Sequence, residues 1–235
     1  MNQRMNIAAQ KMGRPEEDPG RLPAHELIYR QLRALVLFGD LAPGQAVTIQ
    51  GLTDRMGAGM TPVREAIRRL IAEGALEFQG NRRVSVPQLT ADHVSELIIA
   101  RQWLDPYLTK CATERASGED LARLTELDAE LDRAIETGDL RIYLERNYSF
   151  HKAIYDLADQ PILANMADGL WLRFGPSLRV VCGRMGTQNL PDKHKEVLEA
   201  MRAGDGERAA QAICDDVVQG MEQVRLSFGK PGPAT

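Results

Sequence analysis

The sequence predicts a mainly α protein in which a winged helix-turn-helix is followed by an all-α antiparallel helical bundle. Three observations lead to this class. Apolar residues recur at helical spacing through most of the 235 residues. Near the N-terminus, helices separated by a tight turn precede a hairpin with a basic tip. After residue 86 no alternating strand pattern occurs, and residues typical of turns divide the chain into successive helices.

The composition is that of a folded chain large enough for two small domains. Hydrophobic residues make up 43% and charged residues 26% of the sequence, so a buried core is expected. No run approaches the roughly 18 apolar residues of a membrane span, and the N-terminal segment lacks the apolar core of a signal peptide. The three widely spaced cysteines disfavour a disulfide framework. We therefore expect a cytoplasmic protein with no membrane partner.

Charge and turn residues divide the chain into four predicted parts. Residues 1–22 are expected to form a flexible leader, 23–87 the winged helix-turn-helix, 91–228 the helical bundle, and 229–235 a disordered tail. Residues 1–87 carry a formal charge of +3, whereas the remainder carries −7. This asymmetry is expected when only the N-terminal domain contacts phosphate groups.

The N-terminal domain is predicted to hold three helices and a hairpin. The first helix covers residues 25–38, and a short second helix follows it. The third helix has Thr61 as its expected N-cap and ends at Gly74. Strands are expected at residues 76–78 and 84–86.

The start of the third helix and the hairpin tip are the predicted DNA contacts. Side chains near the start of such a helix reach base edges in the major groove, and a guanidinium group matches guanine O6 and N7. We assign this role to Arg64, whereas Thr61 suits phosphate and Arg68 suits either base or phosphate. Arg82 and Arg83 at the hairpin tip suit the DNA backbone or minor groove. The alternative is that these arginines only form a solvated face.

Residues 25–87 resemble the DNA-binding domain of the GntR family of bacterial repressors. The resemblance rests on L-A-P-G at 41–44, T-P-V-R-E-A-I-R-R-L at 61–70 and Glu73-Gly74. It implies a homodimer that reads a short pseudo-palindromic operator in double-stranded DNA.

Two departures from the family pattern affect the predicted DNA contacts. The family usually has Ser-Arg before Thr-Pro, where this chain has Gly59-Met60, and Gln50 replaces an arginine of the preceding helix. Met60 is a candidate for contact with a thymine methyl group. Gln50, Thr53 and Met60 complete the predicted set of contacts. Because two cations are missing, we expect lower operator affinity or an unusual operator.

Most of residues 91–228 resemble the FCD ligand-sensing domain of the FadR subfamily. The resemblance rests on N-Y-S-F-H-K-A-I at 147–154 and H-K-E-V-L-E-A-M at 194–201, followed by Gly204-Asp205. The helices of this region are expected at residues 91–116, 119–136, 140–158, 161–182, 190–203 and 205–228.

The resemblance implies a divalent-metal site in the bundle. Many members of the subfamily hold a metal with one aspartate and three histidines, and the matching positions here are Asn147, His151, His194 and Asp216. Asn147 and His151 are four residues apart and share a helix face. Two imidazoles, one carboxylate and one amide oxygen can bind zinc, nickel or manganese. The alternative is a polar cluster that binds no metal and holds an effector directly.

Arg101 and Arg173 are the predicted effector contacts, because a guanidinium group binds a carboxylate through two hydrogen bonds. The resemblance implies organic acids as a common class of effector. The alternative for Arg101 is a salt bridge with Asp105 inside the bundle. Trp171 and Arg179, on the same predicted helix as Arg173, are further candidates for the cavity lining.

Together these features predict a ligand-responsive DNA-binding transcriptional regulator, acting as a repressor, and not an enzyme. The sequence contains no G-x-S-x-G, P-loop or H-E-x-x-H motif. Two alternatives stay open at this stage. One is a DNA-binding dimer whose bundle no longer senses a ligand. The other is a metal-dependent enzyme, which would need an open coordination position and a placed base.

Overall fold

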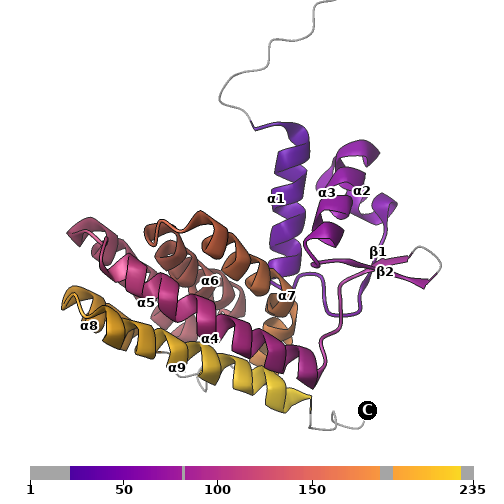
Figure 1. Cartoon of the computed structure of the whole chain (residues 1–235). Coiled ribbons are helices and arrows are strands. Elements are labelled where there is room, and N and C mark those ends of the chain that lie inside the picture. The colour runs from indigo at the N-terminus through magenta and orange to yellow at the C-terminus, as the bar shows by residue number, and fades with distance from the viewer. Residues whose placement is uncertain (1–21, 81–82, 186–192, 229–235) are drawn as a thin grey trace, which may run out of the picture.

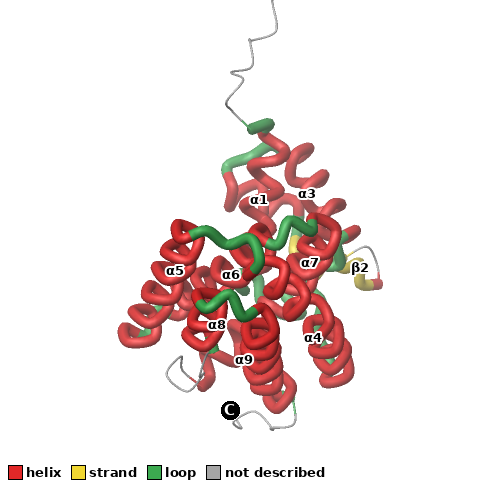
Figure 2. Tube along the Cα trace, turned by 60° about the vertical axis from the view of Figure 1, so that its left-hand side comes forward, coloured by secondary structure: helices red, strands yellow, loops and turns green. Residues whose placement is uncertain are grey.

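The computed structural model describes residues 22–80, 83–185 and 193–228. A small N-terminal domain of helices and strands stands on a larger helical bundle (Figure 1). The strands are confined to one edge of the N-terminal domain (Figure 2). This arrangement confirms the predicted fold class. The predicted tail, and the predicted leader apart from Leu22, lie outside the described residues.

The N-terminal domain contains three helices around a small apolar core. Leu32 and Val36 of the first helix pack with Val63 and Leu70 of the third, and all four side chains are fully buried. This core holds the third helix so that its opposite face stays exposed. The elements are α1 (Ala24–Leu37), β1 (Ala46–Val47), α2 (Ile49–Met56), α3 (Met60–Ala72), β2 (Glu77–Gln79) and β3 (Arg83–Ser85).

The strands form a three-stranded antiparallel sheet in the order β1-β3-β2. Phe78 pairs with Val84, so the observed hairpin lies one residue closer to its turn than predicted. The strand β1 was not predicted. It has two residues, which are too few to show an alternating pattern, and its pairing with β3 forms only when the chain folds back.

The prediction that Thr61 caps α3 is wrong. The helix begins at Met60, and Gly59 occupies the N-cap position with an extended backbone and no side-chain hydrogen bond. Thr61 therefore lies inside the first helical turn, where its side chain is exposed. The C-terminal end of α3 agrees with the predicted stop at Gly74, because this glycine follows the C-cap residue Glu73 with a φ of +74°.

The bundle buries one continuous apolar core between its helices. Leu108, Phe150, Ile154 and Leu198 come from three different helices and are fully buried. The first and last helices lie side by side along the near face of the bundle in Figure 1. The elements are α4 (Ala91–Thr113), α5 (Gly118–Thr137), α6 (Leu140–Leu157), α7 (Pro161–Met185), α8 (His194–Arg202) and α9 (Gly206–Ser227).

The two domains meet where α1 packs against α7 (Figure 1). Arg33 of α1 forms a 2.7 Å ion pair with Asp168 of α7. Asp40, just after α1, faces Arg141 and Arg179 of the bundle. Gly175 allows the closest approach, because a Cβ atom added there would lie 2.1 Å from the carbonyl oxygen of Leu37. Specific contacts therefore join the N-terminal domain to the bundle in this structure.

Replacing Gly175 by alanine is expected to force α1 away from α7 and to lower stability by about 1–3 kcal/mol, the usual cost of overpacking. Thermal melting and limited proteolysis of the segment between the domains would measure this loss. Gly169→Ala on the same helix is the control, because a Cβ there meets nothing within 4 Å. Equal effects of the two substitutions would show that close packing at Gly175 is not important.

Candidate DNA-binding surface and ligand-sensing centre

The exposed face of α3 carries the predicted DNA contacts. Met60, Thr61, Arg64 and Arg68 are all exposed, and Met60 leaves 49% of its surface accessible. The Arg64 side chain forms no ion pair or hydrogen bond with the described residues. Arg68 pairs with Glu65 at 3.4 Å, but both side chains are more than 60% exposed, so this contact is weak and exchangeable.

Arg69 differs from its neighbours on α3 because it has a structural role. Its guanidinium lies 3.5 Å from the centre of the Tyr29 ring. It also forms ion pairs of 3.0 Å with Glu26 and 3.1 Å with Glu73. Arg69 therefore ties α3 to α1, whereas Arg64 and Arg68 make no contact of this kind with α1.

The remaining predicted DNA contacts lie on α2 and on the hairpin, and they differ in exposure. Gln50 is exposed on α2 and donates a 2.8 Å hydrogen bond to Asp54. Arg83 is exposed at the start of β3, and Arg82 lies outside the described residues. Thr53 is partly exposed on α2, and its hydroxyl oxygen is buried without a hydrogen-bond partner among the described residues.

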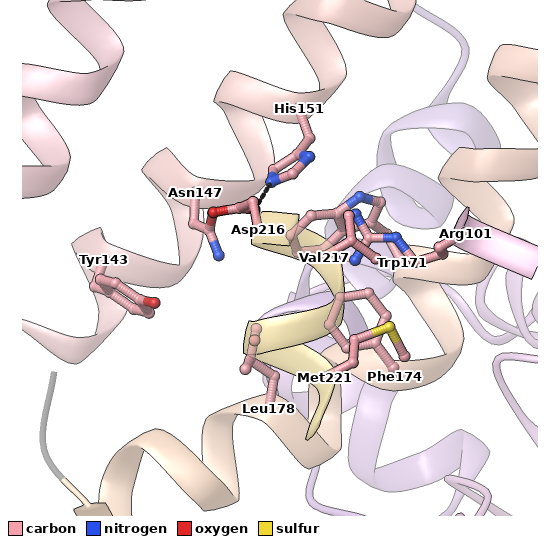
Figure 3. Close-up of a pocket in the computed structure, with 11 residues that line it drawn as sticks. Arg101, Tyr143, Asn147, His151, Trp171, Phe174, Leu178, Asp216, Val217 and Met221 are labelled. Atoms are coloured by element: carbon pink, nitrogen blue, oxygen red, sulfur yellow. Dashed lines mark ion pairs between the residues drawn. The ribbon is translucent and has the colours of Figure 1, made fainter. Parts of the chain in front are cut away.

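In the bundle, three of the four predicted metal ligands converge on one point. His151 comes from α6, His194 begins α8, and Asp216 lies on α9. His151 Nε2 is 3.2 Å from Asp216 Oδ2, and His194 Nε2 is 3.9 Å from Asp216 Oδ1. One ligand atom from each residue lies within 4.8 Å of the others. Asn147 lines the same cavity beside Asp216 (Figure 3).

A second carboxylate faces the other nitrogen of each imidazole. His194 Nδ1 lies 3.4 Å from Asp128 Oδ1 of α5, and His151 Nδ1 lies 4.0 Å from Asp105 Oδ2 of α4. A carboxylate close to Nδ1 can orient a histidine so that its Nε2 lone pair is directed at a cation. Asp128 is near enough to His194 for this role, whereas the 4.0 Å between His151 Nδ1 and Asp105 is too long for a hydrogen bond. Sequence reasoning missed Asp128, because nothing in its local pattern links it to a histidine so far along the chain.

The protonation states of His151 and Asp216 suit metal binding. Burial lowers the pKa of His151, which favours the neutral imidazole. Burial by itself would raise the pKa of Asp216, but His194, His151 and the backbone N–H of Lys193 outweigh this and hold that pKa well below its ordinary value. Metal ions need this combination of neutral imidazole and ionised carboxylate.

Beside the cluster lies a cavity of about 40 Å³. Arg101, Trp171 and Phe174 form one end of its wall (Figure 3). Arg101 is 2% exposed and binds Asp105 through Nε at 3.0 Å and Nη2 at 2.5 Å. Its guanidinium also lies 4.5 Å from the centre of the Trp171 ring. The structure thus contains the salt bridge that was the alternative role for Arg101, while keeping this residue at the cavity wall.

The prediction that Arg173 and Arg179 line the bundle cavity is wrong. Trp171 does line it, but Arg173 is two residues further along the helix and therefore projects from another face. Arg173 lines a separate cavity of about 400 Å³ next to Gly74 and Gln88, between the two domains. Arg179 donates a 3.2 Å hydrogen bond to the carbonyl oxygen of Phe38.

A winged helix-turn-helix with exposed arginines on its third helix, joined to a bundle with an enclosed polar centre, is typical of a DNA-binding transcriptional regulator. Residues 24–86 match the family described as bacterial regulatory proteins, gntR family, and residues 96–217 match the FCD domain. The chain therefore belongs to the GntR family and carries an FCD domain.

Individual relatives agree with this assignment. The chain is 29% identical over 195 residues to the transcriptional regulator McbR of Escherichia coli K12, covering 82% of this chain and 88% of McbR. It is 25% identical over 181 residues to a probable D-xylose utilization operon transcriptional repressor of Paenarthrobacter nicotinovorans, covering 76% of this chain and 79% of the relative. These relatives are regulators, which confirms the prediction that the chain is not an enzyme.

Solved structures show the same architecture. Escherichia coli McbR/YncC matches with a TM-score of 0.83 at 27% identity, covering 88% of this chain and 100% of the other. A GntR regulator from Rhodococcus sp. RHA1 shares the fold, with a TM-score of 0.69 at 21% identity over 85% of this chain and 96% of the other. Among the described residues, no helix has the length and apolar character needed to cross a membrane.

Proposed function

We propose that the protein is a cytoplasmic, homodimeric repressor of the FadR subfamily whose affinity for operator DNA changes when a small carboxylate binds in the bundle. In this proposal residues 23–87 bind DNA, residues 91–228 sense the effector and form the dimer, and residues 86–90 act as the hinge. One observation carries the sensing role: His151, His194 and Asp216 converge beside a cavity at whose wall Arg101 lies.

The donor set in the bundle fits a divalent transition metal. Two imidazoles and one carboxylate within 4.8 Å of one another are ligands that zinc, nickel and manganese accept. Asn147, at the same cavity, offers an amide oxygen as a fourth donor. A metal held by these residues would supply a Lewis acid for the effector carboxylate. Asp128, 3.4 Å from His194 Nδ1, would help to keep that imidazole in orientation.

A chain of contacts joins this centre to the DNA-binding domain. The rings of His151 and Trp171 are 5.0 Å apart, and those of Trp171 and Tyr148 are 5.6 Å apart. The Tyr148 hydroxyl donates a 2.5 Å hydrogen bond to Asp168, which also binds Arg33 of α1. An effector that moves Trp171 would therefore favour one orientation of α1 over another. The free energy of operator binding then changes by the difference between the binding free energies of the effector for the two orientations.

One observation favours the alternative of a DNA-binding dimer with a non-sensing bundle. A cavity of about 40 Å³ holds only a few water-sized groups, and Arg101 is already bound to Asp105. A carboxylate effector must therefore be small, or it must displace Asp105 from Arg101. The two proposals differ in outcome, because only a sensing bundle is stabilised by added metal and small carboxylates in a thermal-melting series.

The Arg64→Ala variant tests the DNA-binding part of the proposal. We expect it to lose specific binding about 10- to 100-fold for each half-site, because a two-point contact between arginine and guanine contributes about 1–3 kcal/mol of discrimination. The measurement is fluorescence anisotropy with duplexes that the wild-type protein selects from a random pool. Circular dichroism of the variant should stay unchanged, because Arg64 is exposed.

Two further variants act as controls for Arg64. Arg30→Ala removes the same charge from α1, where the side chain is 60% exposed and pairs with Glu26. Arg64→Lys keeps the charge but cannot make the two-point contact. We expect Arg30→Ala to bind normally and Arg64→Lys to retain only salt-sensitive, nonspecific binding. Equal losses for Arg30→Ala and Arg64→Ala would contradict the specific role of Arg64.

A further inference from the structure

The cavity between the two domains has no part in the proposed function. Gly74 and Glu77 of the DNA-binding domain line one side of it, and residues of α4 and α7 line the other. The chain between the domains, residues 86–90, runs from the sheet to the start of α4 (Figure 1) and contributes further lining residues. The cavity holds about 400 Å³, against about 40 Å³ in the bundle. This volume lies within the range of roughly 300–1,000 Å³ that is usual for small-molecule sites.

Opposite charges line this interdomain cavity without neutralising one another. Arg173 of α7 lies on its wall together with Glu77 of β2 and Glu96 of α4. All three residues are at least partly exposed, and none of them forms an ion pair or hydrogen bond with the described residues. One cation and two anions are therefore available to a ligand in the same cavity.

The rest of the cavity wall is mainly aliphatic, with Leu89, Leu97 and Leu170 as its largest apolar side chains. A ligand that carries only negative charge would be repelled by the two carboxylates, and one that carries only positive charge would be repelled by the guanidinium. The complementary ligand carries a carboxylate, an ammonium group and an apolar body.

We propose that the interdomain cavity binds an aliphatic α-amino acid as a zwitterion. The ligand carboxylate pairs with Arg173, whose guanidinium can donate two parallel hydrogen bonds to it. The ammonium group pairs with Glu77 or Glu96, and the aliphatic side chain packs against the leucines. This site goes beyond the proposed function, because it requires neither the metal nor the cavity of the bundle.

The position of the cavity links it to the helix that we propose contacts DNA. Gly74 directly follows the C-cap residue of α3, and a Cβ atom added to it would lie 2.7 Å from Arg173 Nη2. A ligand held by Arg173 and Glu96 of the bundle and by Glu77 of the DNA-binding domain favours the domain orientation that brings both walls within reach. Amino-acid binding and operator binding then change each other's affinity by the same factor.

Isothermal titration calorimetry of the full chain tests the ligand class. The probes are L-valine, L-leucine and L-isoleucine, together with isocaproate and isoamylamine, which keep the apolar body of leucine but lack its ammonium or its carboxylate. We expect an amino acid to bind once per chain, and both leucine analogues to bind at least about tenfold more weakly than leucine. Isocaproate that binds as tightly as leucine would overturn the zwitterion, and no binding of the three amino acids at millimolar concentration would overturn the site.

Variants of the charged residues test the location of the site. Arg173→Met, and separately the double variant Glu77→Gln, Glu96→Gln, should weaken amino-acid binding about 10- to 100-fold with unchanged circular dichroism. Arg123→Met is the matched control, because Arg123 is an exposed arginine of α5 that does not line the cavity. Equal losses in Arg123→Met and Arg173→Met would contradict the proposed location.

The double variant His151→Ala, His194→Ala separates this site from the centre in the bundle. We expect it to bind the amino acid like the wild type, and a loss confined to this variant would place the amino acid in the bundle instead. A bundle that responds to neither metal nor carboxylates, with amino-acid binding intact, would contradict only the proposed function. Fluorescence anisotropy with operator DNA, with and without saturating amino acid, tests the link, and equal operator affinities would overturn it.

Discussion

Replacing Arg101 by methionine is expected to lower the free energy of unfolding by about 3–5 kcal/mol, because it leaves a buried charge without its partner. Asp105 is fully buried, and Arg101 supplies two of its hydrogen bonds, at 3.0 and 2.5 Å. The Tyr155 hydroxyl adds a third at 2.9 Å, which is insufficient to replace a cation. Urea denaturation followed by circular dichroism would measure the loss.

A double variant separates the charge effect from a loss of packing. Replacing Arg101 by methionine and Asp105 by leucine together removes both charges while keeping apolar volume, and such exchanges are often close to neutral. We expect the double variant to recover most of the stability lost in Arg101→Met. If Arg101→Met alone is as stable as the wild type, the salt bridge is not structural, and the role of Arg101 as an effector clamp gains support.

Replacing His151 and His194 together by alanine is expected to abolish metal binding. We expect about one transition-metal ion per wild-type chain by elemental analysis and none in the double variant. At a free metal concentration of 100 times the dissociation constant, binding adds about 2.7 kcal/mol of stability. For a chain of this size that corresponds to a fall in Tm of about 5–10 °C on chelation of the wild type. Thermal melting before and after chelation gives this difference.

The chain offers a matched control for this experiment, because it has four histidines and the other two are exposed. His25→Ala with His93→Ala removes the same number of imidazoles without touching the cluster, and metal content should be unchanged. If the wild type contains no metal and is not stabilised by zinc, nickel or manganese, the proposed site is wrong. The effector would then have to be held by Arg101 and direct hydrogen bonds.

The helices and the family were predictable from the sequence because they depend on local patterns. Apolar spacing placed most helices to within a few residues, and turn residues such as Gly138, with a φ of +70°, placed their ends. The motif at residues 61–70 identified the helix that we propose contacts DNA. His151, His194 and Asp216 were matched to family positions one by one, and the folded bundle brings them together.

Local sequence patterns could not predict the short strand β1 or the N-cap residue of α3. A strand of two residues shows no period. The helix α3 begins at Met60, two residues earlier than predicted, so that Gly59 rather than Thr61 occupies the N-cap position. In both cases the competing local choices differ by little free energy, so contacts made elsewhere in the chain decide between them.

The sequence by itself therefore determined the two-domain class and the order of most elements, and it supplied the candidate residues for contact with DNA or a metal. Only the tertiary structure decided that Asp128 faces His194, that Arg173 lies between the domains, and that Arg101 is bound to Asp105. Asp128 and His194 are far apart in the chain, and Arg173 lies outside the cavity because α7 turns it to another face. Such relations depend on how whole helices pack, which no local pattern encodes.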